Sequence, residues 1–170
     1  MLFRSVPPVS NASGNDRRLL AQAGKLLSEA GYEVKNNQRV NAKGEALDIE
    51  FLISDPGFER ILSPYMKNLA AIGVQASIRR VDEAQYQRRV KSFDYDIISA
   101  RFIMSLTPGP ELRNYFSSEA AKAEGSFNLA GIADPAVDAL IVKISEARTR
   151  DDVVTAARAL DRVQIGRAHV

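Results

Sequence analysis

The chain has no cysteine and no tryptophan, and its only histidine, His169, is the second-last of 170 residues. Without cysteine there is no disulfide, thiolate metal site or cysteine nucleophile. A single histidine at the end of the chain argues against a histidine-based catalytic triad and a histidine-rich metal site. Aromatic residues make up 7% of the chain, which argues against a stacking platform for single-stranded nucleic acid.

Long hydrophobic runs are also missing, and none approaches the ~18–20 residues of a membrane-spanning helix. The composition, 45% apolar and 26% charged, is that of one globular domain of ordinary size. The net charge is +2, and acidic residues lie among the basic ones along the whole chain. We therefore expect a mixed, solvated surface and no nucleic-acid partner.

The two ends of the chain read like translated sequencing adapter. Residues 165–170 can be encoded by ATC GGA AGA GCA CAC GTC, one frame of a common adapter, and residues 1–5 fit its reverse complement. We therefore interpret residues 6–164 as natural and the ends as adapter-derived tails; native ends are the alternative. Removing Arg4 and Arg167 from the 23 basic residues leaves 21, which equals the 21 acidic residues.

The first half of the chain predicts a helix, a hairpin and a β-α-β unit. Asn15 or Asp16 can cap the helix, and residues 47–53 alternate as a strand that is buried on one face. Pro64 either kinks the helix that follows this strand or delays its start. The expected elements are a helix to about residue 30, a hairpin at 32–35 and 38–41, the strand at 47–53, a helix at 56–72 and a parallel strand at 74–78.

The second half predicts one more strand, a loop and further helices. Asp82 can cap a short helix, and residues 95–100 form a third strand. A proline- and glycine-rich loop leaves the C-terminal end of that strand, where α/β sheets usually bind ligands. Helices near residues 111–116, from 134 and from 149 complete the chain. The predicted fold class is α/β, a small mixed sheet flanked by helices.

Two charged clusters could carry chemistry, and each has a structural alternative. Asp94 and Asp96 share a strand face, so they could bind a metal or act as acid and base. No histidine or third carboxylate accompanies them, which favours a turn with a solvated Asp94. The pairs Arg79-Arg80 and Arg88-Arg89 could hold a phosphate, but glycine-rich phosphate loops are absent, which favours a strand edge and a solvated helix face.

The segment 101–113 is the most informative local feature, because Arg101 and Arg113 bracket a long loop at the predicted ligand edge. Loops on a rigid scaffold often carry binding, and an arginine can hold a carboxylate with two parallel hydrogen bonds. A crossover loop whose arginines pair with Glu111 or Glu119 explains the same residues. Both interpretations stay open at this point.

Several sequence strings, taken in order, resemble one family over nearly all of residues 16–164. The order resembles the C-terminal lobe of family 5 extracellular solute-binding proteins. The segments 101–113 and 128–132 are most similar to the oligopeptide branch that also takes up peptide–nucleotide antibiotics of the microcin C kind. The strings are LLSEAGY at 26–32, NAKGE at 41–45, LDIEFLI at 47–53, NLAAIGV at 68–74, FDYD at 93–96 and DPAVDALI at 134–141.

The resemblance implies a periplasmic-binding-protein-like lobe, truncated at its C-terminus, from the substrate-binding component of an ABC importer. Such proteins capture a peptide or peptide-like ligand between two lobes by hinge closure and deliver it to permease subunits. We therefore expect a periplasmic monomer without enzymatic activity, cofactor or metal, with a signal peptide in the full-length protein. A small hydrolase using Asp94 and Asp96 near the Arg101 loop, or a small-molecule regulatory domain, is the alternative.

The resemblance also places the ligand at the loop after the third strand. Oligopeptide-binding members hold the peptide's α-amino group with an aspartate there, and this sequence has Ser105 in that place. This departure argues against simple amine recognition. The substrate-binding residues that the resemblance implies are Arg101, Phe102, Ser105 and Leu106, with Arg113 and Asn128 as weaker lining candidates.

Overall fold

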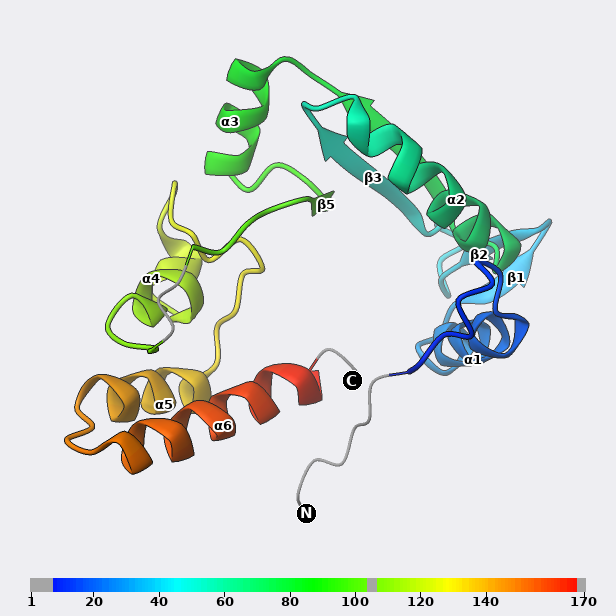
Figure 1. Ribbon diagram of the computed structural model, residues 1–170. Coiled ribbons are helices and arrows are strands. Elements are labelled where there is room, and N and C mark those ends of the chain that lie inside the picture. Colours follow the sequence, from blue (N-terminus) through cyan, green and yellow to red (C-terminus); the bar gives the residue numbers. More distant parts are fainter. Residues whose placement is uncertain (1–7, 104–106, 168–170) are drawn as a thin grey trace. The chain divides into compact units, whose positions relative to one another are not determined.

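A computed structural model describes residues 8–103 and 107–167, and the chain divides into two compact units (Figure 1). We call them the sheet unit, residues 8–89 and 94–100, and the helical unit, residues 90–93 and 101–167. The tail predicted at 1–5 and residues 168–170 of the tail predicted at 165–170 lie outside the described residues. None of the described helices is long and apolar enough to cross a membrane.

The sheet unit follows the predicted order of elements. Its centre is β3, which pairs in parallel with β4 on one edge and with β5 on the other. The hairpin of β1 and β2 forms a second, antiparallel sheet. The elements are α1 Arg17–Glu29, β1 Glu33–Lys35, β2 Gln38–Val40, β3 Asp48–Ile53, α2 Gly57–Ala71, β4 Gln75–Arg80, α3 Glu83–Lys91 and β5 Ile97–Ile98.

These elements confirm the predicted α/β class and the parallel β-α-β unit. In place of the one mixed sheet that was predicted, the antiparallel and the parallel strands form two separate small sheets. The strand predicted at 95–100 is also shorter, because β5 spans only Ile97–Ile98. α2 continues through Pro64 as one helix, so the later helix start is wrong. The hairpin turn is as predicted: Asn36 and Asn37 have φ angles of 48° and 66°, the left-handed pair that tight hairpins require.

The predicted one-sided burial of β3 is wrong at its C-terminal end. Phe51, Leu52 and Ile53 are consecutive, and they are 3%, 0% and 4% exposed. The ring of Phe51 faces α2, where it meets the edge of Tyr65 with 5.9 Å between the ring centroids. Leu52 points to the opposite face and is covered as well, because the middle strand of a parallel sheet is packed on both sides.

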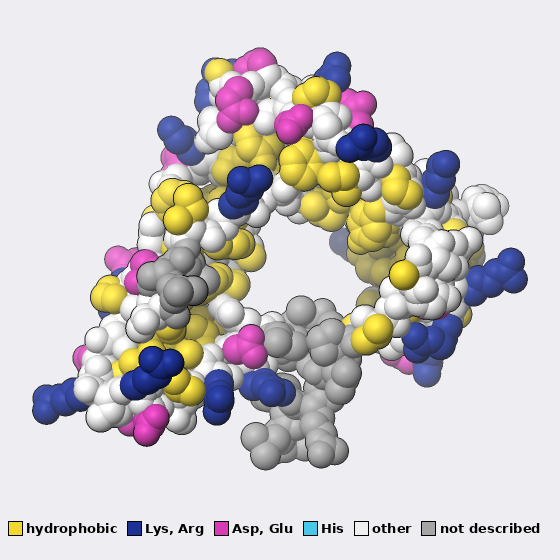
Figure 2. All heavy atoms as spheres, viewed as in Figure 1, with side chains coloured by type: hydrophobic (Ala, Val, Ile, Leu, Met, Phe, Trp, Pro, Cys, Tyr) yellow, Lys and Arg dark blue, Asp and Glu magenta, His cyan; other side chains and the backbone are white. Residues whose placement is uncertain are grey.

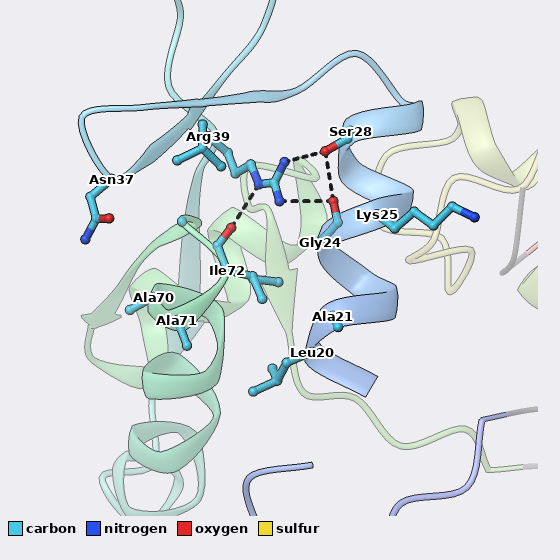
Figure 3. Close-up of a pocket in the computed structure, with 12 residues that line it drawn as sticks. Leu20, Ala21, Gly24, Lys25, Ser28, Asn37, Arg39, Ala70, Ala71 and Ile72 are labelled. Atoms are coloured by element: carbon cyan, nitrogen blue, oxygen red, sulfur yellow. Dashed lines mark hydrogen bonds between the residues drawn. The ribbon is translucent and has the colours of Figure 1, made fainter. Parts of the chain in front are cut away.

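Arg39 joins three elements of the sheet unit at one point (Figure 3). Its guanidinium donates from Nη1 to Ser28 Oγ at 2.8 Å and to the Tyr32 carbonyl at 2.9 Å. It also donates from Nη2 to the Gly24 carbonyl at 3.0 Å, and from Nε to the Ile72 carbonyl at 2.9 Å. Arg39 is only 7% exposed, so these bonds form out of water and tie α1, the hairpin and the end of α2 together.

Every acceptor of the Arg39 guanidinium is an uncharged oxygen, and no carboxylate pairs with it among the described residues. Ile72 is the C-cap of α2, and Gly24 and Ser28 lie in the C-terminal half of α1. Helix C-termini carry a partial negative charge of about half an electron. The C-terminal end of α2, at Ile72, therefore helps to compensate the buried positive charge, and the other acceptor oxygens complete its hydrogen bonding.

A charged network lies on the face of the three-stranded sheet that is opposite to the Phe51 ring and α2. Glu50 of β3 accepts from Arg79 Nε at 2.7 Å and from Arg89 Nη2 at 3.1 Å. Arg89 Nε also reaches Asp94 at 2.8 Å, and Asp96 accepts from the Glu50 backbone N–H at 2.8 Å. The hydrogen bond from Arg79 is the main interaction that lowers the pKa of Glu50. The network connects β3, β4, α3 and the approach to β5.

The helical unit has an apolar core between two helices that lie side by side (Figure 1). Asp134 caps the first, α5, by accepting from Ala136 N–H at 2.7 Å, as predicted. Thr149 caps the second, α6, by accepting from Asp152 N–H at 3.2 Å. The elements are α4 Leu112–Phe116, the 3-10 helix η1 Ala120–Lys122, α5 Pro135–Ser145 and α6 Arg150–Arg167, and the buried core is Leu112, Val137, Ile141, Ile144, Ala156 and Leu160.

Replacing Arg39 should destabilise the sheet unit. Arg39→Met removes all four hydrogen bonds and leaves partly buried oxygens short of a donor, so we expect the free energy of unfolding to fall by about 3 kcal/mol. Arg39→Lys keeps the charge but not the planar fork, and should give an intermediate loss. Urea unfolding measures both. The matched control is Arg60→Met, an exposed arginine on α2, which should change stability by less than about 0.5 kcal/mol.

Glu50 should make folding stability depend on acid. Because folding lowers the pKa of Glu50 below its ordinary 4.5, the ionised form stabilises the folded state above that pH. We expect Glu50→Gln to cost about 1 kcal/mol near neutral pH. The difference from the parent chain should shrink as the pH falls below 4.5, through the folded-state pKa. A difference in the free energy of unfolding that stays constant from about pH 7 to pH 3 would contradict this. The control is Glu124→Gln, a change of an exposed glutamate.

Candidate functional site

Four aromatic rings of the helical unit form a cluster around Tyr115, which we call the aromatic cluster. The Tyr115 ring meets the Phe102 ring edge-on, with 5.5 Å between the centroids and 74° between the planes. It lies 5.7 Å from the Phe127 ring and 6.0 Å from the Phe116 ring, both tilted. These separations are those of attractive aromatic pairs. Residues that are far apart in the sequence thus pack around the short helix α4.

The short helix α4 positions this cluster. Leu112 and Phe116 are four residues apart, so they share the helix face that packs against the α5–α6 core. Tyr115 lies beside that face, and its hydroxyl donates to the Ile103 carbonyl at 2.9 Å. This bond fixes the segment that carries Phe102 to α4. The cluster therefore rests on the hydrophobic core at one side and on a backbone hydrogen bond at the other.

The outer rings of the cluster are open to solvent. Phe102 is 45% exposed and Phe127 is 54% exposed, and the neighbouring Ile103 is 85% exposed. Single exposed apolar residues are common, but adjoining large ones are typical of a surface that binds something. Phe102 is one of the residues that the sequence predicted for ligand binding, and the structure places it in this surface.

Each of the two predicted arginines lies close in the sequence to a ring of the aromatic cluster. Arg101 precedes Phe102, and Arg113 lies two residues before Tyr115 on α4. Both arginines are exposed. Neither guanidinium forms a hydrogen bond or an ion pair within the described part of the chain. Glu111, a partner that the alternative interpretation offered, instead accepts from the Gly109 N–H at 3.0 Å.

Arg113 lines two neighbouring hollows of about 340 and 270 Å3, and Ser117 and Glu119 line both with it. Asp138 lies in the smaller one and accepts from the Ser118 N–H at 2.8 Å. The hydrogen bonds from Ser118 hold the pKa of Asp138 below its ordinary value, and the charge of Arg113 adds to this. The region around Arg113 thus presents both charge signs to solvent.

Of the remaining predicted site residues, Ser105 and Leu106 lie outside the described residues. Asn128 is fully buried, and its side-chain amide donates to the carbonyls of Ser117 and Ile132 at 2.9 and 2.8 Å. Its amide oxygen accepts from the Ile132 N–H at 2.9 Å. These bonds hold the turn before α5, so this geometry gives Asn128 a structural role away from any exposed surface.

The charged pairs of the sheet unit are occupied by the protein itself. Asp94 pairs with Arg89, and Asp96 binds a backbone N–H of the central strand, as the network above describes. Arg80 pairs with Glu59 of α2 at 3.2 Å. No group of three or more metal-ligating side chains is present in residues 8–103 and 107–167. Figure 2 shows basic and acidic side chains interspersed on the visible face, as the sequence predicts.

A hollow of about 520 Å3 in the sheet unit is lined by Arg39 and its neighbours. Figure 3 shows that its one buried cation is directed into the protein, toward Gly24, Ser28 and Ile72. The charge of Arg39 is therefore engaged by the protein itself and is not offered to a ligand in this hollow. The sequence predicted Phe102 and both arginines of the helical-unit surface, but it gave no signal for Phe127, and it predicted only a helix for Tyr115.

Comparison with known proteins gives consistent matches. Residues 3–124 match the family described as bacterial extracellular solute-binding proteins, family 5 Middle. A probable peptide-binding protein, YejA of Agrobacterium fabrum, is 48% identical over 96% of this chain and 27% of its own length. A peptidoglycan-binding protein, YepA of the same organism, is 42% identical over 93% of this chain and 26% of its own. The chain spans about a quarter of the length of the curated relatives it matches.

Solved structures share the fold. A periplasmic oligopeptide-binding protein of Thermotoga maritima, bound to mannohexaose, has a TM-score of 0.74 at 17% identity, over 86% of this chain and 29% of its own. The oligopeptide-binding protein AppA of Bacillus subtilis, in complex with a nonapeptide, has a TM-score of 0.73 at 16% identity, over the same shares. At these identities the likeness shows the fold alone, and it confirms the predicted periplasmic-binding-protein-like class. By its sequence match, the chain belongs to family 5 of the bacterial extracellular solute-binding proteins.

Proposed function

We propose that this chain is part of the substrate-binding component of an ABC importer for oligopeptides or peptide-like compounds. Residues 6–164 would form part of its C-terminal lobe, which captures ligand against a second lobe for delivery to permease subunits. The single observation that carries the proposal is the 48% identity, over 96% of this chain, to a probable peptide-binding protein. Identity at this level across nearly the whole chain favours a shared ligand class over a shared fold alone.

The ligand-facing surface that we propose consists of the exposed side of the aromatic cluster together with Arg101 and Arg113. Arg101 and Phe102 are its proposed central residues, and Arg113 of α4 is a proposed lining residue. Ser105 and Leu106 follow in the same loop and remain proposed lining residues. An arginine that forms no ion pair within the described residues can hold a carboxylate of a peptide, and exposed rings can cover the apolar side chains of the peptide. Asn128 supports this surface through the turn that it holds.

We further propose that the protein is a periplasmic monomer that binds its ligand without chemical change. The family and the relatives are solute-binding proteins, which supports this. The alternative of a small hydrolase requires Asp94 and Asp96 to act together on a substrate. Both carboxylates already bind Arg89 or a backbone N–H, which disfavours that use.

The chain by itself should bind peptides weakly, because one part of a lobe offers a ligand only one wall. In titration calorimetry of the 170-residue chain with tri- and pentapeptides, we expect no binding tighter than about 100 μM. A submicromolar dissociation constant would contradict the two-lobed mechanism. Circular dichroism of the same sample confirms that the chain is folded.

Peptide binding should return when the chain is placed in a whole relative. Residues 6–164 would replace the matching segment of the Agrobacterium fabrum relative, which is 48% identical to this chain. We expect the chimera to bind the peptides that the parent binds, within about tenfold in dissociation constant. A second chimera with Arg101→Gln and Arg113→Gln should bind more weakly. A chimera that melts like the parent but binds none of its peptides would overturn the proposed function.

A further inference from the structure

We propose that the aromatic cluster is a subsite for the side chain of an aromatic residue at the carboxyl end of a peptide ligand. The inference rests on the proposed function and narrows its substrate class. It makes Phe102, Tyr115 and Phe127 specificity-determining residues, of which the last two carry no sequence signal of their own.

The subsite is formed before any ligand arrives. Tyr115 is held by the hydrogen bond from its hydroxyl to Ile103 and by ring contacts on three sides. Phe116 packs against the α5–α6 core and fixes the base of the cluster. A rigid surface loses little conformational entropy on binding, so its contacts contribute to affinity almost in full.

Two residues of the cluster are about half exposed, so their rings are accessible to an aromatic group of a ligand. Phe102 and Phe127 are 45% and 54% exposed, and each contacts Tyr115 through a separate ring pair. A ligand ring that packs against them would remove apolar surface from water on both partners. It would also gain edge-to-face or offset contacts that a leucine side chain of similar size cannot make.

The two arginines that lie close to the rings in the sequence select the rest of the ligand in this proposal. Arg101 is the chain neighbour of Phe102, Arg113 lies one helical turn from Phe116, and neither guanidinium is paired within the described residues. These charges attract a carboxylate and repel a basic peptide. A C-terminal aromatic residue carries a ring and a carboxylate on the same α-carbon, so it can address both features at once.

Three peptides and the 170-residue chain test this inference by NMR. Gly-Gly-Phe presents the ring and the carboxylate, Gly-Gly-Leu lacks the ring, and Gly-Gly-Phe-amide lacks the carboxylate. At millimolar concentrations we expect Gly-Gly-Phe to shift the ring signals of Phe102, Tyr115 and Phe127. Its dissociation constant should be about three- to tenfold lower than that of either other peptide.

Matched variants assign the selectivity to the cluster. Phe127→Leu changes an exposed residue, so the fold should persist, and the preference for Gly-Gly-Phe over Gly-Gly-Leu should fall to near one. Tyr65→Leu, a change at a 51% exposed ring of the sheet unit, should leave the preference intact. Arg101→Gln should reduce the preference for the free carboxylate over the amide without removing the preference for the ring.

Each failure has its own meaning. Equal binding of Gly-Gly-Phe and Gly-Gly-Leu would overturn the aromatic subsite and leave the proposed peptide-binding function standing. A preference that survives Phe127→Leu, or ring signals that no peptide shifts, would also overturn it. The proposed function is judged separately by the chimera, which depends on peptide binding of any kind.

Discussion

The sheet unit depends on one buried cation. Arg39 lies at the junction of α1, the hairpin and the end of α2, and it reaches all three through a single planar group. Its acceptors are three backbone carbonyls and one hydroxyl, so among the described residues uncharged oxygens alone stabilise this buried positive charge. Gly73 belongs to the same constraint, because a Cβ there would lie 3.3 Å from Arg39 Cγ. The hairpin, the helix ends and this glycine therefore have to be placed together.

The two units hold themselves together in different ways. In the sheet unit neither α1 nor α2 contains a fully buried residue, and the buried apolar side chains are confined to the strands and their approaches. The hydrogen bonds and ion pairs of Arg39 and Glu50 consequently contribute more to fixing the arrangement of elements there than they would beside a larger hydrophobic core. In the helical unit, interlocking aliphatic side chains of α5 and α6 supply the core, and the aromatic cluster is seated on it. The candidate ligand surface thus lies on the helical unit, whose core is made of packed aliphatic side chains.

Local features of the fold could be predicted from the sequence, and features made by distant residues could not. The caps at Asp16, Asp82 and Asp134 were predictable because each side chain bonds N–H groups two or three residues away. The burial of Leu52 depends on what covers the far face of the sheet, which alternation cannot reveal. Arg39 carries a charge that usually marks an exposed position, and Phe127 joins the site only through tertiary packing. Arg101, Phe102 and Arg113 of the candidate surface were therefore visible in advance, whereas the roles of Tyr115 and Phe127 were not.

The path of the chain between the two units has a consequence for its synthesis. Residues 94–100 return to the sheet unit after residues 90–93 have already entered the helical unit. The last strand, β5, adds to the free edge of β3 within that return. On the ribosome, where segments emerge from the N-terminus onward, the sheet therefore stays one strand short until the first residues of the other unit have been made. Neither unit is a continuous piece of the gene, so the two are inherited and translated as interleaved parts.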